Sequence, residues 1–257
     1  MDTGHDVTAN PFPATGASNY CRHDGTRLVR VGVDVEPTML TVFVHDSVLA
    51  LTLNPQFTCA GAKSAVRQRS HRFGLYPALG DSASAAALAY DLYLFVREAP
   101  TIAGDFTTMI ASFEGPAIGD EATFERLLWS TLQHLHDLDV AHHAWAAGVS
   151  ADAAAPDFSF SFAETPFFVV GLHAASSRVT RRFAWPTLVF NLHRQFEALK
   201  QEGRFERFRQ VIRDAERRLQ GDVNPMSFDF GERSEAAQYS GRQVDGAWRC
   251  PFAARKR

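Results

Sequence analysis

The sequence predicts a single α+β domain in which several helices pack on a small mixed or antiparallel sheet. Two helix-like patterns of apolar residues and a candidate β-hairpin support this prediction, and no internal repeat or low-complexity linker divides the chain. With 257 residues, 46% of them hydrophobic and 21% charged, the chain can bury one substantial core. Residues 1–26 are rich in Gly, Pro, Asn, Ser and Thr. We therefore expect a mobile N-terminal arm over 1–26 and one domain over 27–257.

The first half of the domain predicts strands followed by two helices. Clusters of Val, Leu and Phe between Leu28 and Leu53 indicate one or two strands around a turn at Glu36-Pro37. Asp81-Ser82 can cap a helix whose inward face is Leu88, Leu92, Phe95 and Val96. A second helix begins near Asp120-Glu121 and buries Phe124, Leu127, Leu128, Leu132 and Leu135.

The second half predicts a hairpin followed by two more helices. The segment 158–162 alternates Phe and Ser as a half-buried strand does, and 164–166 turns the chain into the apolar run 167–172. Helical periodicity returns from about Thr187 to Leu199 and from Phe205 to Leu219, with Gly203 between them. Beyond Gly221 we expect irregular chain that wraps over the core.

Composition and missing motifs exclude several classes of protein. A net charge of −3 and a pI of about 6.4 give no basic field for nucleic acid or anionic membrane. Three cysteines without a CxxC pair argue against a disulfide framework or a structural zinc site, and no CxxCH motif is present for covalent heme. No signal peptide is apparent and the apolar run 39–53 is too short to span a bilayer, so we expect a cytoplasmic soluble protein. The chain also lacks GxGxxG, Walker and GxSxG motifs.

Two islands of sequence carry a resemblance to a known family. One is Phe-Thr-Cys-Ala-Gly-Ala-Lys-Ser-Ala at 57–65. The other, from Phe167 to Phe252, contains Phe-Asn-Leu-His-Arg-Gln-Phe, Gln-Tyr-Ser-Gly-Arg and Trp-Arg-Cys-Pro-Phe. Together they resemble the YqcI/YcgG-like family over roughly residues 55–252. That family includes heme-dependent N-hydroxylases of guanidino and amino groups, of the guanitoxin and D-cycloserine pathway type.

The resemblance implies a function with defined cofactors. It implies a monooxygenase that binds heme b non-covalently and N-hydroxylates a guanidino or amino group of arginine or a related amino acid. Oxygen would be the oxidant, and a separate reductase would supply electrons because the chain encodes no dinucleotide or flavin site. The same heme site without turnover would instead make a carrier or sensor, and a metal-free small-molecule binder is a third possibility.

The axial ligand of such a heme has two candidates. Cys59 lies beside small residues that let a flat macrocycle approach the backbone, and a thiolate ligand favours O–O cleavage. Lys63 or a helix N-terminus would keep the sulfur ionised, although a lone cysteine is also a common small core residue. His173 follows a buried strand and is the rival ligand.

Charged and amide residues of the second island are candidates for binding heme propionates and substrate. Arg178, Arg181 and Arg182 suit carboxylates such as propionates, with a solvated charged face as the alternative. Arg242 is a further carboxylate anchor. Glu235 is a candidate partner for a substrate cation, or else a helix-start residue beside Ser234. Substrate-contacting amides are expected at two positions of the predicted helix, Asn191 and Gln195.

Overall fold

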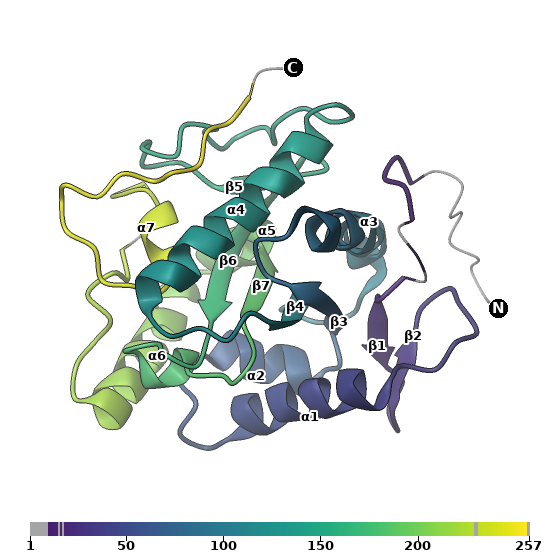
Figure 1. The fold of residues 1–257 in the computed structure, drawn as a ribbon. Coiled ribbons are helices and arrows are strands. Elements are labelled where there is room, and N and C mark those ends of the chain that lie inside the picture. The colour runs from purple at the N-terminus through teal and green to yellow at the C-terminus, as the bar shows by residue number, and fades with distance from the viewer. Residues whose placement is uncertain (1–9, 15, 17, 229–230, 256–257) are drawn as a thin grey trace.

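A mixed sheet of seven strands forms the centre of the protein, and helices cover both of its faces (Figure 1). We describe residues 10–14, 16, 18–228 and 231–255 of a computed structural model. The strand order is β2-β1-β3-β4-β7-β6-β5. Strands β3 and β4 pair in parallel and the other neighbours pair antiparallel. The predicted α+β class is confirmed.

The strands vary from three to eight residues in length. They are β1 (Cys21–His23), β2 (Leu28–Arg30), β3 (His71–Ala78), β4 (Thr108–Gly115), β5 (Phe160–Phe162), β6 (Thr165–Leu172) and β7 (Thr187–Leu192). Of the three longest, β4 is the central strand, β3 lies beside it and β6 is second from the edge of the sheet. Of the arm expected over 1–26, Cys21–His23 forms β1 and pairs with β3, and residues 1–9 lie outside the described part.

Seven α-helices and two 3-10 turns complete the described chain. They are α1 (Met39–Leu53), α2 (Ala60–Arg67), α3 (Ser82–Glu98), η2 (Ala99–Thr101), α4 (Glu121–Asp139), η3 (Val179–Arg181), α5 (His193–Gln201), α6 (Phe205–Gln220) and α7 (Ala236–Tyr239). The predicted cap at Asp81 and the predicted helix start near Asp120 are both confirmed. The Asp81 carboxylate accepts from the Ser84 amide, and the Asp120 carboxylate from the Thr123 amide. Among the described residues, no helix is long and apolar enough to cross a membrane.

The two faces of the sheet build two separate cores. Side chains alternate along a strand, so Phe167 and Val169 of β6 face α3 and α4, where the larger core lies. Phe168, Val170 and Leu172 of β6 face the opposite side, which α1, α2 and α6 cover. This second face holds the cavities described below.

Helix α6 differs from the other long helices because it is only loosely packed. All of its residues are described, and each of them keeps some exposure to solvent. Its main apolar contact is Phe208, whose ring stacks on Phe106 with 5.2 Å between centroids. Glycines with positive φ flank it on both sides, Gly203 at 67° and Gly221 at 87°.

Two predicted elements are wrong in type. Residues 39–53, expected within a strand region, form helix α1, which Thr38 caps by accepting from the Thr41 amide. Residues 187–192, expected as the start of a helix, form strand β7, and the helix begins only at His193. The helix predicted from Phe205 is confirmed as α6.

The predicted hairpin is confirmed, with two differences of detail. Strands β5 and β6 pair antiparallel, and the turn between them is Ala163-Glu164, both with positive φ. Residues 158–162 are fully buried rather than half-buried. The reason is that Ser159 donates to Glu235 from the C-terminal segment, while Phe252 packs against Phe158.

Candidate functional site

An apolar cavity of about 210 Å3 lies between the sheet and helices α1, α2 and α6. We call it the cysteine cavity, because Cys59 is on its wall. The sheet contributes alternate residues of β4, β6 and β7 to its floor. Its other sides are mostly aliphatic and aromatic, including Leu51, Phe57, Ala62, Phe106, Phe196, Phe208 and Ile212. Its walls suit an apolar ligand, and its volume lies below the roughly 300–1,000 Å3 of common ligand pockets.

Cys59 is the N-cap residue of α2, so its sulfur lies at the positive end of a helix. The Sγ atom accepts from the Ala62 amide, with 3.5 Å between sulfur and nitrogen. Burial raises the pKa of the thiol, and the amides of Ala62 and Gly61 and the charge of Arg181 lower it. A metal cation bound to the sulfur would favour the thiolate further.

The cation that acts on Cys59 is Arg181, and the expected Lys63 points elsewhere. Lys63 donates from Nζ to the carbonyl of Pro55 at 3.1 Å, on the outside of α2. Arg181 is enclosed, and burial lowers the pKa of its guanidinium to about 10. Its Nη1 donates to the carbonyl of Tyr239 at 3.0 Å. Of the three clustered arginines, Arg181 is therefore the one coupled electrostatically to the cavity cysteine.

A second cavity of about 190 Å3 adjoins the first. We call it the glutamate cavity, because Glu235 is on its wall. The two cavities share four residues, Phe168, Phe196, Phe208 and Ile212, which form an apolar partition between them. Its wall also carries His193, Lys200, Phe205, Arg209, Arg213, Ser227, Phe228 and Gln238. Charged and aromatic side chains are therefore combined here, in contrast to the cysteine cavity.

Glu235 is a buried carboxyl group with one oxygen occupied. Its Oε1 accepts from the hydroxyls of Ser159 at 2.7 Å and Tyr239 at 2.5 Å, and the side chain is 3% exposed. Burial raises its pKa to about 7, against the lowering effect of these two donors and of the Lys200 charge. Glu235 does stand at the N-cap position of α7, but its side chain makes no capping hydrogen bond. Its position in a cavity wall thus favours the binding interpretation over the helix-start interpretation.

His173 lies on the opposite face of the sheet from Cys59. It continues the face of β6 that carries Phe167 and Val169, and its ring stacks on Phe124 of α4 with 4.2 Å between centroids. It is fully buried, and burial lowers its pKa to about 4. Neither ring nitrogen has a hydrogen-bond partner within the described chain. Cys59 and His173 are therefore not brought to one site.

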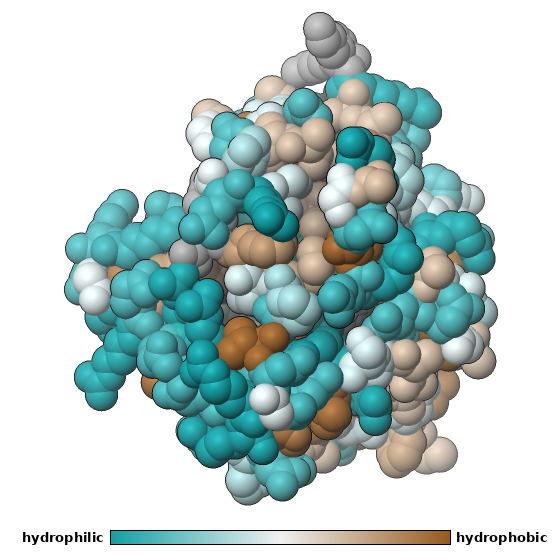
Figure 2. Space-filling model, turned by 90° about the vertical axis from the view of Figure 1, so that its left-hand side faces the viewer, coloured by the Kyte–Doolittle hydropathy of each residue, from teal (hydrophilic) through white to brown (hydrophobic). Residues whose placement is uncertain are grey.

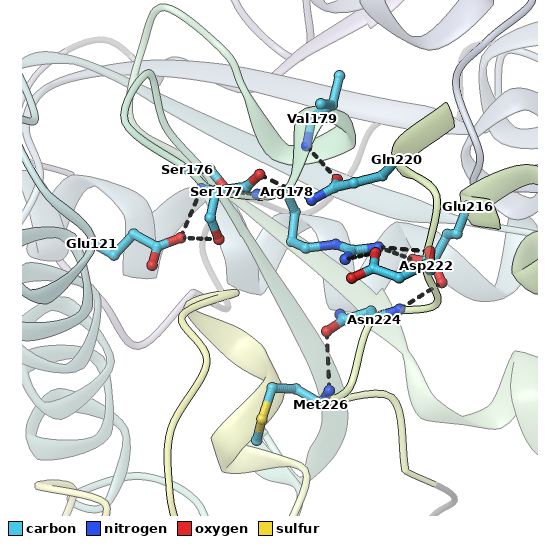
Figure 3. A network of polar contacts seen from close by, with 10 residues as sticks. All are labelled: Glu121, Ser176, Ser177, Arg178, Val179, Glu216, Gln220, Asp222, Asn224 and Met226. Carbon is cyan, nitrogen blue, oxygen red and sulfur yellow. Dashed lines mark hydrogen bonds and ion pairs between the residues drawn. The ribbon is translucent and has the colours of Figure 1, made fainter. Parts of the chain in front are cut away.

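Arg178 secures the end of α6 rather than facing a cavity (Figure 3). Its Nη1 lies 2.6 Å from Oδ1 of Asp222, and its Nη2 lies 3.9 Å from Oε1 of Glu216. Beside it, Gln220 accepts from the amide of Val179 and donates to the carbonyl of Ser177. The network joins the C-terminal end of α6 to the loop after β6.

The remaining candidate residues contact the protein itself. Arg182 donates from Nε to the carbonyl of Ser176 at 2.8 Å. Arg242 makes a two-point ion pair with Glu125, Nε to Oε2 at 2.5 Å and Nη2 to Oε1 at 3.2 Å. These contacts use the guanidinium groups that would otherwise hold a carboxylate.

The two amides lie at the cysteine cavity but are hydrogen-bonded within the protein. Asn191 is in strand β7, not in a helix, and donates to the carbonyl of Phe168 at 3.2 Å. Gln195 is in α5 and accepts from the amide of Thr107 at 2.9 Å. Both side chains line the cysteine cavity. They therefore lie near one another as predicted, although they do not share a helix.

The three lysine and arginine residues of the glutamate cavity were not predicted as site residues from the sequence. They are Lys200, Arg209 and Arg213, all from the arginine- and lysine-rich segment around α5 and α6. Figure 2 looks onto the side of the molecule where α6 and α7 lie, and there hydrophilic residues surround small apolar patches. In the part of the chain that the structure describes, no three His, Cys, Asp or Glu residues are grouped to hold a metal ion.

Comparison with known proteins gives one result. The model of the YqcI/YcgG family matches residues 45–253, which include both cavities and both sequence islands. No curated protein and no solved structure shows significant similarity to the chain.

Proposed function

The chain belongs to the YqcI/YcgG family, and on that premise we propose that it is a heme-dependent monooxygenase. It would N-hydroxylate a guanidino or amino group of arginine or a related amino acid. The observation that carries the proposal is Cys59, a cysteine at a helix N-terminus on the wall of an apolar cavity. A soft sulfur donor and apolar walls suit an iron porphyrin.

Cys59 would hold the iron, and its surroundings would set its basicity. The amides at the start of α2 and the charge of Arg181 favour the thiolate against the effect of burial. Bound in this way, heme would supply activation of O2, and a thiolate ligand favours cleavage of the O–O bond. One oxygen atom would form the N–O bond and the other would leave as water, with two electrons and two protons from an external reductase.

The neighbouring glutamate cavity would hold the substrate. Its wall offers one carboxyl group, Glu235, for the cationic nitrogen end of an amino acid. The residues shared by the two cavities, Phe168, Phe196, Phe208 and Ile212, would line the boundary at which the substrate nitrogen approaches the cofactor, and would exclude water there. The protein's part would be to bind, to orient the nitrogen and to exclude water.

The ligand assignment is tested by absorption spectroscopy of protein expressed with a heme precursor. We expect a Soret band, heme that an acidic organic solvent extracts, and a thiolate-type ferrous–CO band that disappears in Cys59→Ala. Cys250→Ala is the matched control, since that cysteine is half-buried and lines neither cavity. Protein that never acquires a Soret band would refute heme binding. An imidazole-type band lost only in His173→Ala would refute the cysteine ligand.

Catalysis is tested separately from heme binding. Loaded protein is given O2, a reductant and L-arginine, and the product is analysed by mass spectrometry for one added oxygen atom on a guanidino nitrogen. Heme binding without a hydroxylated product from arginine, lysine or related amines would favour a carrier or sensor instead.

A further inference from the structure

The glutamate cavity carries opposite charges at different depths. Glu235 is 3% exposed, whereas Arg213 of α6 is only half-buried. Both residues line the cavity, and the structure records no ion pair between them. A ligand that spans the cavity would therefore meet a carboxyl group at its inner end and a guanidinium group nearer to solvent.

Arg213 differs from Arg209 and Lys200 of this wall because the described residues include no hydrogen-bond or ion-pair partner for it. Arg209 is paired with Glu206 at 2.5 Å, and Lys200 with Glu197 at 2.9 Å. The Nε atom of Arg213 is buried without a hydrogen-bond acceptor, and no ion pair is found for this side chain among the described residues. A buried guanidinium nitrogen without an acceptor is costly unless a ligand supplies one.

Five phenylalanines contribute to the wall of the cavity. Phe168, Phe196, Phe205, Phe208 and Phe228 line it, so an aliphatic chain or a planar cation can pack against rings there. The available volume of about 190 Å3 is many times the roughly 10–15 Å3 that one water needs. The cavity thus combines a buried acid, half-buried aromatic walls and a half-buried base.

We infer that this cavity binds a small zwitterion, with its cationic end at Glu235 and its carboxylate at Arg213. This deepens the proposed function, because it names Arg213 as the residue that positions the substrate. It also replaces the four arginines expected from the sequence. Arg178 and Arg242 already bind carboxylates of the protein, and Arg181 and Arg182 donate to backbone carbonyls.

Calorimetric titration of purified protein with L-arginine and with agmatine, its analogue without the carboxylate, tests this inference. Arg213→Gln should weaken arginine binding by roughly tenfold to a hundredfold while leaving agmatine binding unchanged. Glu235→Gln should weaken both ligands by a similar factor. Arg217→Gln, one turn further along α6 and outside the cavity wall, is the matched control and should change neither.

The outcomes separate this inference from the proposed function. Binding of arginine with this pattern in protein that acquires no heme would keep the inference and refute the heme proposal. Equal loss of arginine and agmatine in Arg213→Gln, or unchanged arginine binding, would overturn the role of Arg213. Wild-type protein that binds neither ligand would overturn the zwitterion site itself.

Discussion

The buried carboxyl of Glu235 makes stability depend on pH in a way that one substitution removes. Glu235→Gln keeps an oxygen that accepts from Ser159 and Tyr239 but cannot ionise. Burial raises the pKa of Glu235 to about 7 from its ordinary value of 4.5. The folded protein therefore holds this proton more tightly than the unfolded chain does.

The sign and size of the effect follow from that difference. Stabilisation by the retained proton is complete below pH 4.5 and is lost as the pH rises to about 7, because ionisation then places a charge in the interior. Each unit of difference in pKa is worth about 1.4 kcal/mol. The raised pKa of Glu235 therefore corresponds to a loss of roughly 3 kcal/mol in the free energy of unfolding of the wild type. The free energy of unfolding of Glu235→Gln, minus that of the wild type, should rise by this amount between pH 4.5 and 8.

Urea unfolding at a series of pH values measures this difference. Asp91, whose pKa burial raises to about 6, titrates in both proteins and cancels. Glu114→Gln is the control, because Glu114 is exposed at the end of β4. A difference between Glu235→Gln and wild type that stays constant with pH, or falls as pH rises, would refute the reasoning from burial.

Two further predictions concern the support of the cavities. Arg242→Ala removes the two-point partner of Glu125, and the buried carboxylate keeps its hydrogen bond from Trp248 Nε1 at 2.6 Å. We expect the free energy of unfolding in urea to fall by about 2 kcal/mol and the heme content to stay unchanged. A loss of heme with unchanged stability would instead make Arg242 a cofactor residue. Gly171→Ala places a methyl group against the ring of Phe124 and the carbonyl of Tyr239. This overpacking should lower the free energy of unfolding by about 1–3 kcal/mol. A melting temperature equal to that of the wild type would show that the neighbouring residues make room for the methyl group without loss of stability.

Local signals predicted the elements that carry strong caps or a clear turn. Asp81 and Asp120 mark the starts of α3 and α4 because an N-cap is a short-range interaction. The apolar run 39–53 was misread because apolar residues occur all round α1, which leaves no helical period to detect. Segment 187–192 was misread as helical, although it is a continuous apolar strand paired on both sides.

The cavity residues depend on contacts that are distant in sequence. Cys59 and Glu235 were predicted from their islands, and the structure places them at adjoining cavities. Nothing local distinguishes Arg242 from Arg213. The first is neutralised by Glu125, which is 117 residues away, whereas the second belongs to an arginine-rich helix and finds no ion pair within the described chain. The alternation of β6 puts His173 on the opposite face of the sheet from Cys59, so the two candidate ligands belong to different sites.

The shallow packing of α6 has a consequence for how the cavities exchange their contents. A helix whose residues all keep some exposure buries little apolar surface, so opening it costs less free energy than unfolding the sheet. Phe208 and Ile212 belong to both cavity walls, so an opening of α6 that also breaks the contacts of Glu216 and Gln220 would remove both side chains together. Local opening of this one segment therefore connects both compartments to solvent while the central strands stay paired. Amide hydrogen exchange would then be fast in α6 and slow in β4 and β7.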